Sequence, residues 1–378
     1  MYDASLSYEE NYAKGPFPLL TSGKKFPKIK YTDKPKFEFL GIPLHIPFGV
    51  PAGPLLNSKF VKVALDAGFC LPIYKTVRSS FWACNAWPNV LNISAENKSL
   101  FADNHNKVTA VQFDPHDYSK KNISISNSFG APSQSPDVWT EDFYSLLPYS
   151  SQVGSHVVLS FQGSRIDTVN LARAKEAFYE DAQKACELAV NAVTKTGFHV
   201  LEINLSCPNE SQLPIYKDVP NSIKLLAAVN DVIKKHKHIK LVVKIGSLSN
   251  EEIRMLLSEA SEYMHAVSAI NTISADILSK DGQVMLGSKA ISGGVCGSLI
   301  FEQGVRMTSM LAQEREKLGI KKQNLGIIGV GGVMSADNFA SYLNAGADVV
   351  QAATGMMWNL NLAQDIANYL KVSYILEN

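Results

Sequence analysis

Short apolar runs alternate along most of the chain with longer segments in which apolar residues recur every three or four positions. Runs of this kind are typical of strands in a parallel sheet that is covered on both faces. We find eight of them, at residues 48–52, 72–76, 156–161, 200–205, 241–245, 266–271, 326–330 and 348–354. The pattern therefore predicts an α/β fold with a parallel sheet.

Helical periodicity is clearest over residues 171–196, and Gly197 is the expected C-cap. A second predicted helix begins after Ser335 as N-cap, directs Phe339 inward and ends before Gly346. Eight strands alternating with helices predict a closed (β/α)8 TIM barrel. A doubly wound open sheet is the alternative.

Two kinds of segment fall outside this alternation. Residues 1–35 are polar, rich in lysine and interrupted by prolines, so we expect an N-terminal extension, followed by the barrel domain over residues 36–378. Residues 78–124 and 274–297 are long insertions between predicted strands. We expect them at the C-terminal face of the barrel, where loops of this length are usually functional.

Composition narrows the class of protein. The 36 basic and 35 acidic residues nearly cancel, which argues against a nucleic-acid partner. Five widely spaced cysteines form no CxxC pair, which argues against a disulfide framework and a structural metal site. The N-terminus lacks the features of a signal peptide, and no apolar run approaches the ~18–20 residues of a membrane span. We expect a cytoplasmic protein that does not bind membranes.

Candidate chemistry gathers where the predicted strands end, which is where barrel enzymes place their active sites. These residues are mostly glycines, amides and lysines rather than the mixed charges of a solvated loop. They are Ala52, Gly53, Lys75, Thr76, Asn204, Cys207, Asn209, Lys244, Asn271, Thr272, Gly331, Gly332 and Thr354.

The last two strands indicate an anion site. Gly331 and Gly332 lie between a strand and a helix, where backbone N–H groups can face a phosphate, and Thr354 follows the next strand. A tight turn that requires glycine is the alternative. Lys75 and Lys244 either extend to the rim or stabilise negative charge on an electron-rich ring such as a flavin.

Cys207 is either a small buried apolar residue or a proton-transfer group in a cavity. No histidine stands at ligand spacing to it, so metal binding is disfavoured. Asn127, Asn204, Asn209 and Asn271 offer neutral donors and acceptors, which suits a small planar heterocycle with C=O and N–H edges.

Residues 204–209 read Asn-Leu-Ser-Cys-Pro-Asn, and this stretch resembles the active-site motif of the class 1 dihydroorotate dehydrogenases. The resemblance extends in order over most of the chain from Phe37 onward, including Asn127 to Gly130 and Gly293 to Gly297. It implies an FMN-dependent enzyme of pyrimidine biosynthesis that oxidises (S)-dihydroorotate to orotate. Cys207 would remove the C5 proton, while hydride passes from C6 to flavin N5.

The resemblance also implies roles for individual residues. The substrate would contact Lys75, Asn127, Gly130, Asn204, Asn209, Asn271 and Thr272. FMN would contact Ala52, Gly53, Lys75, Thr76, Asn204, Lys244, Gly294, Gly297, Gly331, Gly332 and Thr354. The main departure from the family is the loop after Asn209, which is shorter than a typical substrate lid. Ala131 and Ala353 are smaller departures.

Several relatives provide alternatives. Dihydropyrimidine dehydrogenase, which reduces uracil and thymine, shares much of the motif, but tends to have histidine where this chain has Asn209. The tRNA dihydrouridine synthases would need a basic face. A flavin-binding subunit without catalytic activity is the alternative that is not an enzyme. The class 2 dihydroorotate dehydrogenases use serine in place of Cys207.

The electron acceptor stays open between fumarate, NAD through a partner subunit, and quinone. The chain has no cluster-binding cysteine set, so an iron–sulfur centre would have to belong to another chain. We expect a homodimer that uses fumarate.

Overall fold

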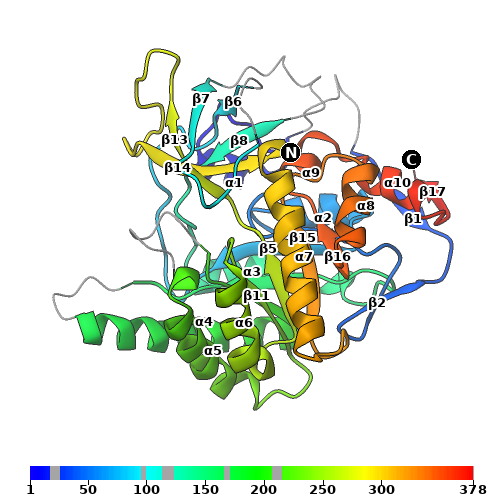
Figure 1. The fold of residues 1–378 in the computed structure, drawn as a ribbon. Coiled ribbons are helices and arrows are strands. Elements are labelled where there is room, and N and C mark those ends of the chain that lie inside the picture. Colours follow the sequence, from blue (N-terminus) through cyan, green and yellow to red (C-terminus); the bar gives the residue numbers. More distant parts are fainter. Residues whose placement is uncertain (18–25, 95–98, 113–122, 166–170, 207–214, 378) are drawn as a thin grey trace.

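The computed structural model describes residues 1–17, 26–94, 99–112, 123–165, 171–206 and 215–377. Eight parallel strands close into a barrel in the order β10-β11-β12-β15-β16-β4-β5-β9. Every predicted barrel strand is present, and the TIM barrel is confirmed (Figure 1). The strands are β4 (Phe48–Val50), β5 (Leu71–Val77), β9 (Val158–Phe161), β10 (Val200–Asn204), β11 (Lys240–Lys244), β12 (Ala266–Ala269), β15 (Gly326–Val330) and β16 (Val349–Gln351).

Helices between the strands cover the barrel from outside. The two helices predicted from periodicity are confirmed as α4 and α8, and the Ser335 side chain caps α8 by accepting from the Asn338 N–H. Within the described residues, no helix is long and apolar enough to cross a membrane. The outer helices are α2 (Ser58–Asp66), α3 (Pro136–Tyr144), α4 (Leu171–Thr196), α5 (Val219–Ile233), α6 (Asn250–Ala260), α7 (Phe301–Lys317), α8 (Ala336–Asn344) and α10 (Leu362–Tyr369), and the short α9 (Thr354–Trp358) follows β16.

The two long insertions combine into a second sheet. Its strands close in the order β13-β14-β8-β6-β7, at the upper left of Figure 1 and away from α4, α5 and α6. The pair β8 and β14 is antiparallel and places Asn127 opposite Gly294. The strands are β6 (Asn92–Ile93), β7 (Lys107–Val111), β8 (Ser124–Asn127), β13 (Ile273–Leu278) and β14 (Ser292–Gly297).

The N-terminal segment has structure and packs against the rest of the molecule. Helix α1 (Tyr8–Lys14) begins with a capping box at Ser7, and β1 (Ile29–Tyr31) pairs antiparallel with β17 (Tyr374–Leu376). A hairpin of β2 (Phe37–Phe39) and β3 (Ile42–Leu44) follows. The rings of Tyr2 and Tyr8 meet Phe129 edge-on, so this segment touches the loop after β8. The division at residue 35 stays a prediction.

Candidate active site

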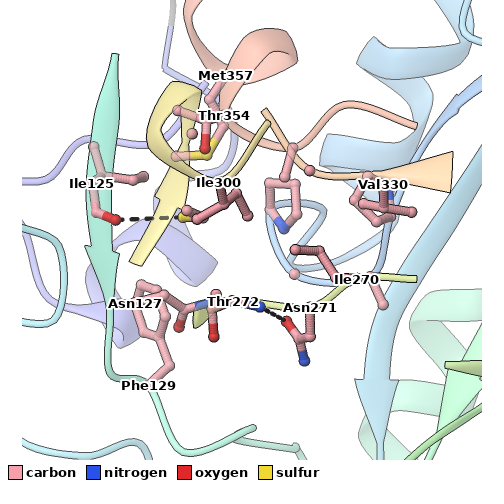
Figure 2. A pocket seen from close by; sticks show the side chains of 18 of the residues that line it. Ile125, Asn127, Phe129, Ile270, Asn271, Thr272, Ile300, Val330, Thr354 and Met357 are labelled. Carbon is pink, nitrogen blue, oxygen red and sulfur yellow. Dashed lines mark hydrogen bonds between the residues drawn. The ribbon is translucent and has the colours of Figure 1, made fainter. Parts of the chain in front are cut away.

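A cavity of about 1200 Å³, including its opening to solvent, lies where the barrel strands end beneath the second sheet. Figure 2 shows Asn127, Asn271 and Thr272 on one side of this cavity and Thr354 with Met357 on the other. Most of the residues that the sequence predicts for the site line it together. These are Ala52, Gly53, Lys75, Thr76, Asn127, Asn204, Lys244, Asn271, Thr272, Gly297, Gly331, Gly332 and Thr354.

Two predicted site residues of the described structure do not line the cavity, and two others lie outside the described residues. Gly294 lies directly behind Thr272, because a Cβ atom on it would stand 2.3 Å from the Thr272 Oγ1. The Gly130 carbonyl accepts from the Arg78 guanidinium at 3.4 Å. Cys207 and Asn209 lie outside the described residues.

Hydrogen bonds between side chains fix the amides on one wall. The Asn204 amide donates to Gln162 Oε1 at 2.8 Å, and its oxygen accepts from the backbone and hydroxyl of Ser206. The Asn271 amide donates to the Ser206 carbonyl and hydroxyl at 3.0 and 2.8 Å. The Thr272 N–H donates to Asn271 Oδ1, as Figure 2 shows. This wall is therefore preorganised to bind polar groups of a ligand.

Two lysines bring positive charge into the cavity. Lys75 and Lys244 are only 7% and 6% exposed, although lysine is rarely buried without compensation. The Lys244 ammonium donates to the Ser268 hydroxyl at 3.2 Å. Burial lowers the pKa of Lys244 to about 8, and the negative charge of Glu202 opposes that shift. At neutral pH, Lys244 is thus mostly cationic and close to its titration.

The glycine turn after β15 has room for an anion. Gly331 and Gly332 have φ values of +130° and +70°, which side chains rarely adopt. A Cβ atom on Gly332 would lie 2.7 Å from that of Phe301, so glycine is also required by space. Across from the turn, the buried Thr354 Oγ1 has no hydrogen-bond partner. A hydroxyl of this kind fits a phosphate oxygen, as the sequence predicts.

The structure adds residues that were not predicted for the site, although Phe129 and Cys296 lie within stretches that carry the resemblance. Tyr2, Phe129 and Cys296 line the cavity. Burial raises the pKa of Cys296 to about 11, so its thiol is neutral at physiological pH. Among the described residues, no group of three or more histidine, cysteine or acidic side chains could hold a metal ion.

Arg78 supports the loop after β8 without lining the cavity. It is fully buried and donates to the carbonyls of Ala131 and Gly163, each at 3.0 Å. An arginine directly after an apolar strand was the available signal for this role. The role itself could not be predicted, because the carbonyls that Arg78 binds lie 52 to 85 residues away along the chain and only the fold brings them to it.

These features are typical of a barrel enzyme whose active site lies at the C-terminal ends of its strands, with buried cations and a glycine turn that suit an anionic ligand. The model of the family described as dihydroorotate dehydrogenase matches residues 114–372. A dihydroorotate dehydrogenase of Dictyostelium discoideum is 33% identical over 96% of this chain and 95% of its own. The chain belongs to the dihydroorotate dehydrogenase family, whose members are flavin-dependent oxidoreductases.

Other relatives differ in the electron acceptor that their names give. The catalytic subunit of dihydroorotate dehydrogenase B (NAD(+)) from Thermodesulfovibrio yellowstonii is 27% identical over 61% of this chain and 68% of its own. Relatives named for quinone also match. A crystal structure of the Eimeria tenella enzyme in complex with ferulenol shares the fold, with a TM-score of 0.64, 20% identity and coverage of 96% of this chain and 88% of that one. The matches thus include both NAD(+)-named and quinone-named members of the family.

Proposed function

We propose that this protein is a class 1, FMN-dependent enzyme that oxidises (S)-dihydroorotate to orotate in de novo pyrimidine biosynthesis. The main observation behind the proposal is that two buried lysines, three asparagines and the glycine turn line the same cavity. Two cations suit a ring that gains negative charge on reduction, and the amides suit a pyrimidine. Family membership supports the same reaction.

FMN would supply the hydride acceptor for this reaction. Gly331, Gly332 and Thr354 would hold its phosphate, since their backbone and free hydroxyl face the cavity. Lys244 would stabilise negative charge beside the ring. The remaining contacts proposed for FMN come from Ala52, Gly53, Lys75, Thr76, Asn204, Gly294 and Gly297.

Dihydroorotate would lie against the amide wall. Asn127, Asn204, Asn271 and Thr272 offer donors and acceptors to its C=O and N–H groups, and Lys75 contributes positive charge near its carboxylate. Asn209 and the backbone at Gly130 would complete the contacts. Because the wall is held by its own hydrogen bonds, binding would orient the substrate at little entropic cost.

Cys207 would be the base that accepts the proton from C5 of the substrate. An ordinary thiol has a pKa of about 8.5, so the active thiolate becomes more abundant as pH rises through that value. We therefore expect substrate reduction of the bound flavin to accelerate over that pH range. Cys207→Ser should slow the reaction severely while FMN stays bound.

The test is anaerobic mixing of the purified protein with dihydroorotate, followed by the loss of flavin absorbance. Cys70→Ser is the matched control, because Cys70 is buried and donates to the Gly68 carbonyl, a bond that serine can also make. The control should bleach as fast as the wild type. An unchanged rate in Cys207→Ser would remove this cysteine from the mechanism, and bleaching by reduced uracil alone would favour the dihydropyrimidine reaction.

We further propose a cytoplasmic homodimer that passes electrons to fumarate. Cys70, Cys84, Cys186 and Cys296 are free thiols in the described structure, which suits a reducing compartment. Reoxidation of the reduced protein by fumarate, NAD and quinone, each added separately, tests the acceptor. Fast reoxidation by fumarate alone is the expected result.

A further inference from the structure

We infer that Glu202 is a positioning residue for Lys244: it supplies the counter-charge that keeps this lysine cationic beneath the cofactor. The inference rests on the proposed function, because it assigns Lys244 to a flavin. It concerns a residue that does not line the cavity, and whose carboxylate would act only through its neighbour.

Glu202 lies inside the barrel on β10, two residues before Asn204. Its side chain is fully buried. One carboxylate oxygen accepts from the Ser160 hydroxyl at 3.0 Å, and the Ser160 hydroxyl lies 3.0 Å from that of Thr76 in the cavity wall. The other carboxylate oxygen, Oε2, is buried without a hydrogen-bond partner. A carboxyl group is therefore buried inside the barrel with only one of its two oxygens hydrogen-bonded.

In the pairing of β10 with β11, Glu202 is opposite Val242 and Asn204 is opposite Lys244. Residues two apart on a strand share a face, so Glu202 and Lys244 are diagonal neighbours inside the barrel. Among the described residues, Lys244 is the charged group that affects the pKa of Glu202. Glu202 is likewise the charged group that affects the pKa of Lys244. The adjoining strands β5, β9 and β12 present the neutral hydroxyls of Thr76, Ser160 and Ser268, and β5 also carries Lys75, the second cation of the cavity. The pair thus forms a small electrostatic unit.

The energetics of burial explain why each group needs the other. Burial raises the pKa of Glu202 and lowers that of Lys244, since both charged forms lose hydration, while their mutual attraction opposes both shifts. Apolar residues would fill this space at lower cost. Without the carboxylate, no nearby negative charge would offset the desolvation of the Lys244 ammonium. It would then lose its proton at a lower pH.

A neutral lysine would no longer stabilise negative charge on the reduced cofactor. Lys244 is cationic below its pKa, so in the wild type the midpoint potential should fall more steeply once pH rises past about 8. In Glu202→Gln this bend should move to lower pH. At pH 7 we expect at least a tenfold loss in the preference for reduced over oxidised cofactor, which corresponds to about 30 mV for a two-electron couple.

The experiment is potentiometric titration of the flavin-loaded protein from pH 6 to 9, with no substrate present. Glu202→Asp should restore part of the wild-type potential, because it keeps the charge. Glu314→Gln is the matched control: Glu314 is also a buried carboxylate, but it pairs with Arg254 on the outer helices and should leave the potential unchanged. If Glu202→Gln does not fold, Ser160→Ala removes the bond that orients the carboxylate and should shift the potential in the same direction.

A double variant separates this role from a structural one. In a Lys244→Met background, Glu202→Gln should no longer change the potential, because the charge it supports is gone. A wild-type potential in flavin-loaded Glu202→Gln, or a full shift in the double variant, would overturn the inference. Absence of flavin from the wild-type protein would overturn the proposed function itself.

Discussion

The Thr354 hydroxyl shows how a single residue can reveal a ligand. It is 3% exposed, and its oxygen makes no hydrogen bond of ordinary geometry within the described protein, although the Cys296 thiol is close enough to interact with it. A buried polar atom without a partner costs about 1–3 kcal/mol, so the protein loses stability by keeping it. A phosphate oxygen in the adjoining cavity would accept the hydrogen bond and recover that cost.

Replacing Thr354 by valine therefore has opposite effects with and without FMN. The affinity for FMN should fall roughly tenfold, because a hydrogen bond to a charged group contributes about 1.5 kcal/mol. The flavin-free protein should be as stable as the wild type or more stable. Fluorescence titration with FMN and thermal unfolding of the apoprotein measure the two effects.

Thr308→Val is the control for this substitution. The Thr308 hydroxyl is equally buried, but donates to the Gly304 carbonyl at 3.0 Å within α7. This variant should lose stability and keep its affinity for FMN. Equal affinity losses in both variants would contradict the assignment of Thr354.

Sequence and structure contributed differently to the charged residues. Lys75 and Lys244 could be predicted, because lysine at the end of an apolar strand is unusual and barrel sites lie there. Glu202 stands inside the same kind of strand, but nothing in the sequence shows which charge it faces. Its pairing depends on the register of β10 against β11, which only the closed sheet determines.

The turn between β15 and α8 is the element that requires glycine most strictly. Gly332 combines a φ of +70° with a close approach to Phe301, so its missing side chain serves both conformation and packing. Gly319, at the end of α7, has a similar φ of +67° but no atom within 4 Å of an added Cβ. Substitutions at these two glycines therefore distinguish the cost of backbone strain from the cost of a clash between the new side chain and its neighbours.

Gly332→Ala should lose about 2–4 kcal/mol of unfolding free energy and most of its affinity for FMN, because the turn must shift away from Phe301. Gly319→Ala should lose only about 1 kcal/mol, from the left-handed conformation alone, and bind FMN normally. Chemical denaturation and flavin titration provide both readouts. Normal FMN binding by Gly332→Ala would argue against a phosphate site at this turn.

Elements with strong local patterns were predicted well. The strands of the barrel and the helix over residues 171–196 follow from apolar periodicity, which is a local property. The second sheet was not predicted as a sheet. Its strands β8 and β14 are short and lie more than 160 residues apart, so their pairing depends on the barrel that brings the two insertions together.

At the scale of the whole molecule, the end of the barrel opposite the cavity contains a pH-sensitive pair. His156, just before β9, is buried, and its Nε2 accepts from the His199 N–H at 3.2 Å. Burial, as the larger cause, and the neighbouring His199 together lower the pKa of His156 to about 3. This histidine is therefore neutral in the folded protein.

The native state should lose stability as the solution becomes acidic. The unfolded chain binds a proton at His156 near its ordinary pKa of about 6.5, whereas the folded chain does so only near 3. Stability is thus fully present above about 6.5 and is lost as pH falls toward 3, by up to about 5 kcal/mol. Denaturant unfolding between pH 7 and 4 measures the slope.

His156→Gln should flatten that slope, because glutamine can accept the same hydrogen bond without taking up a proton. His238→Gln, at an exposed position, is the control and should leave the slope as in the wild type. An unchanged slope in His156→Gln would assign the acid sensitivity to other groups.

The sequence by itself determined the barrel, the order of its strands and the strand ends that carry the lysines, amides and glycines, because each depends on local periodicity and on a fixed rule of barrel architecture. Tertiary structure alone decided that Tyr2 and Phe129 meet at the cavity, that Arg78 supports the loop after β8, and that Glu202 and Lys244 share the interior of the barrel. Contacts of this kind join residues distant in the chain. They depend on closure and register, which no local pattern encodes.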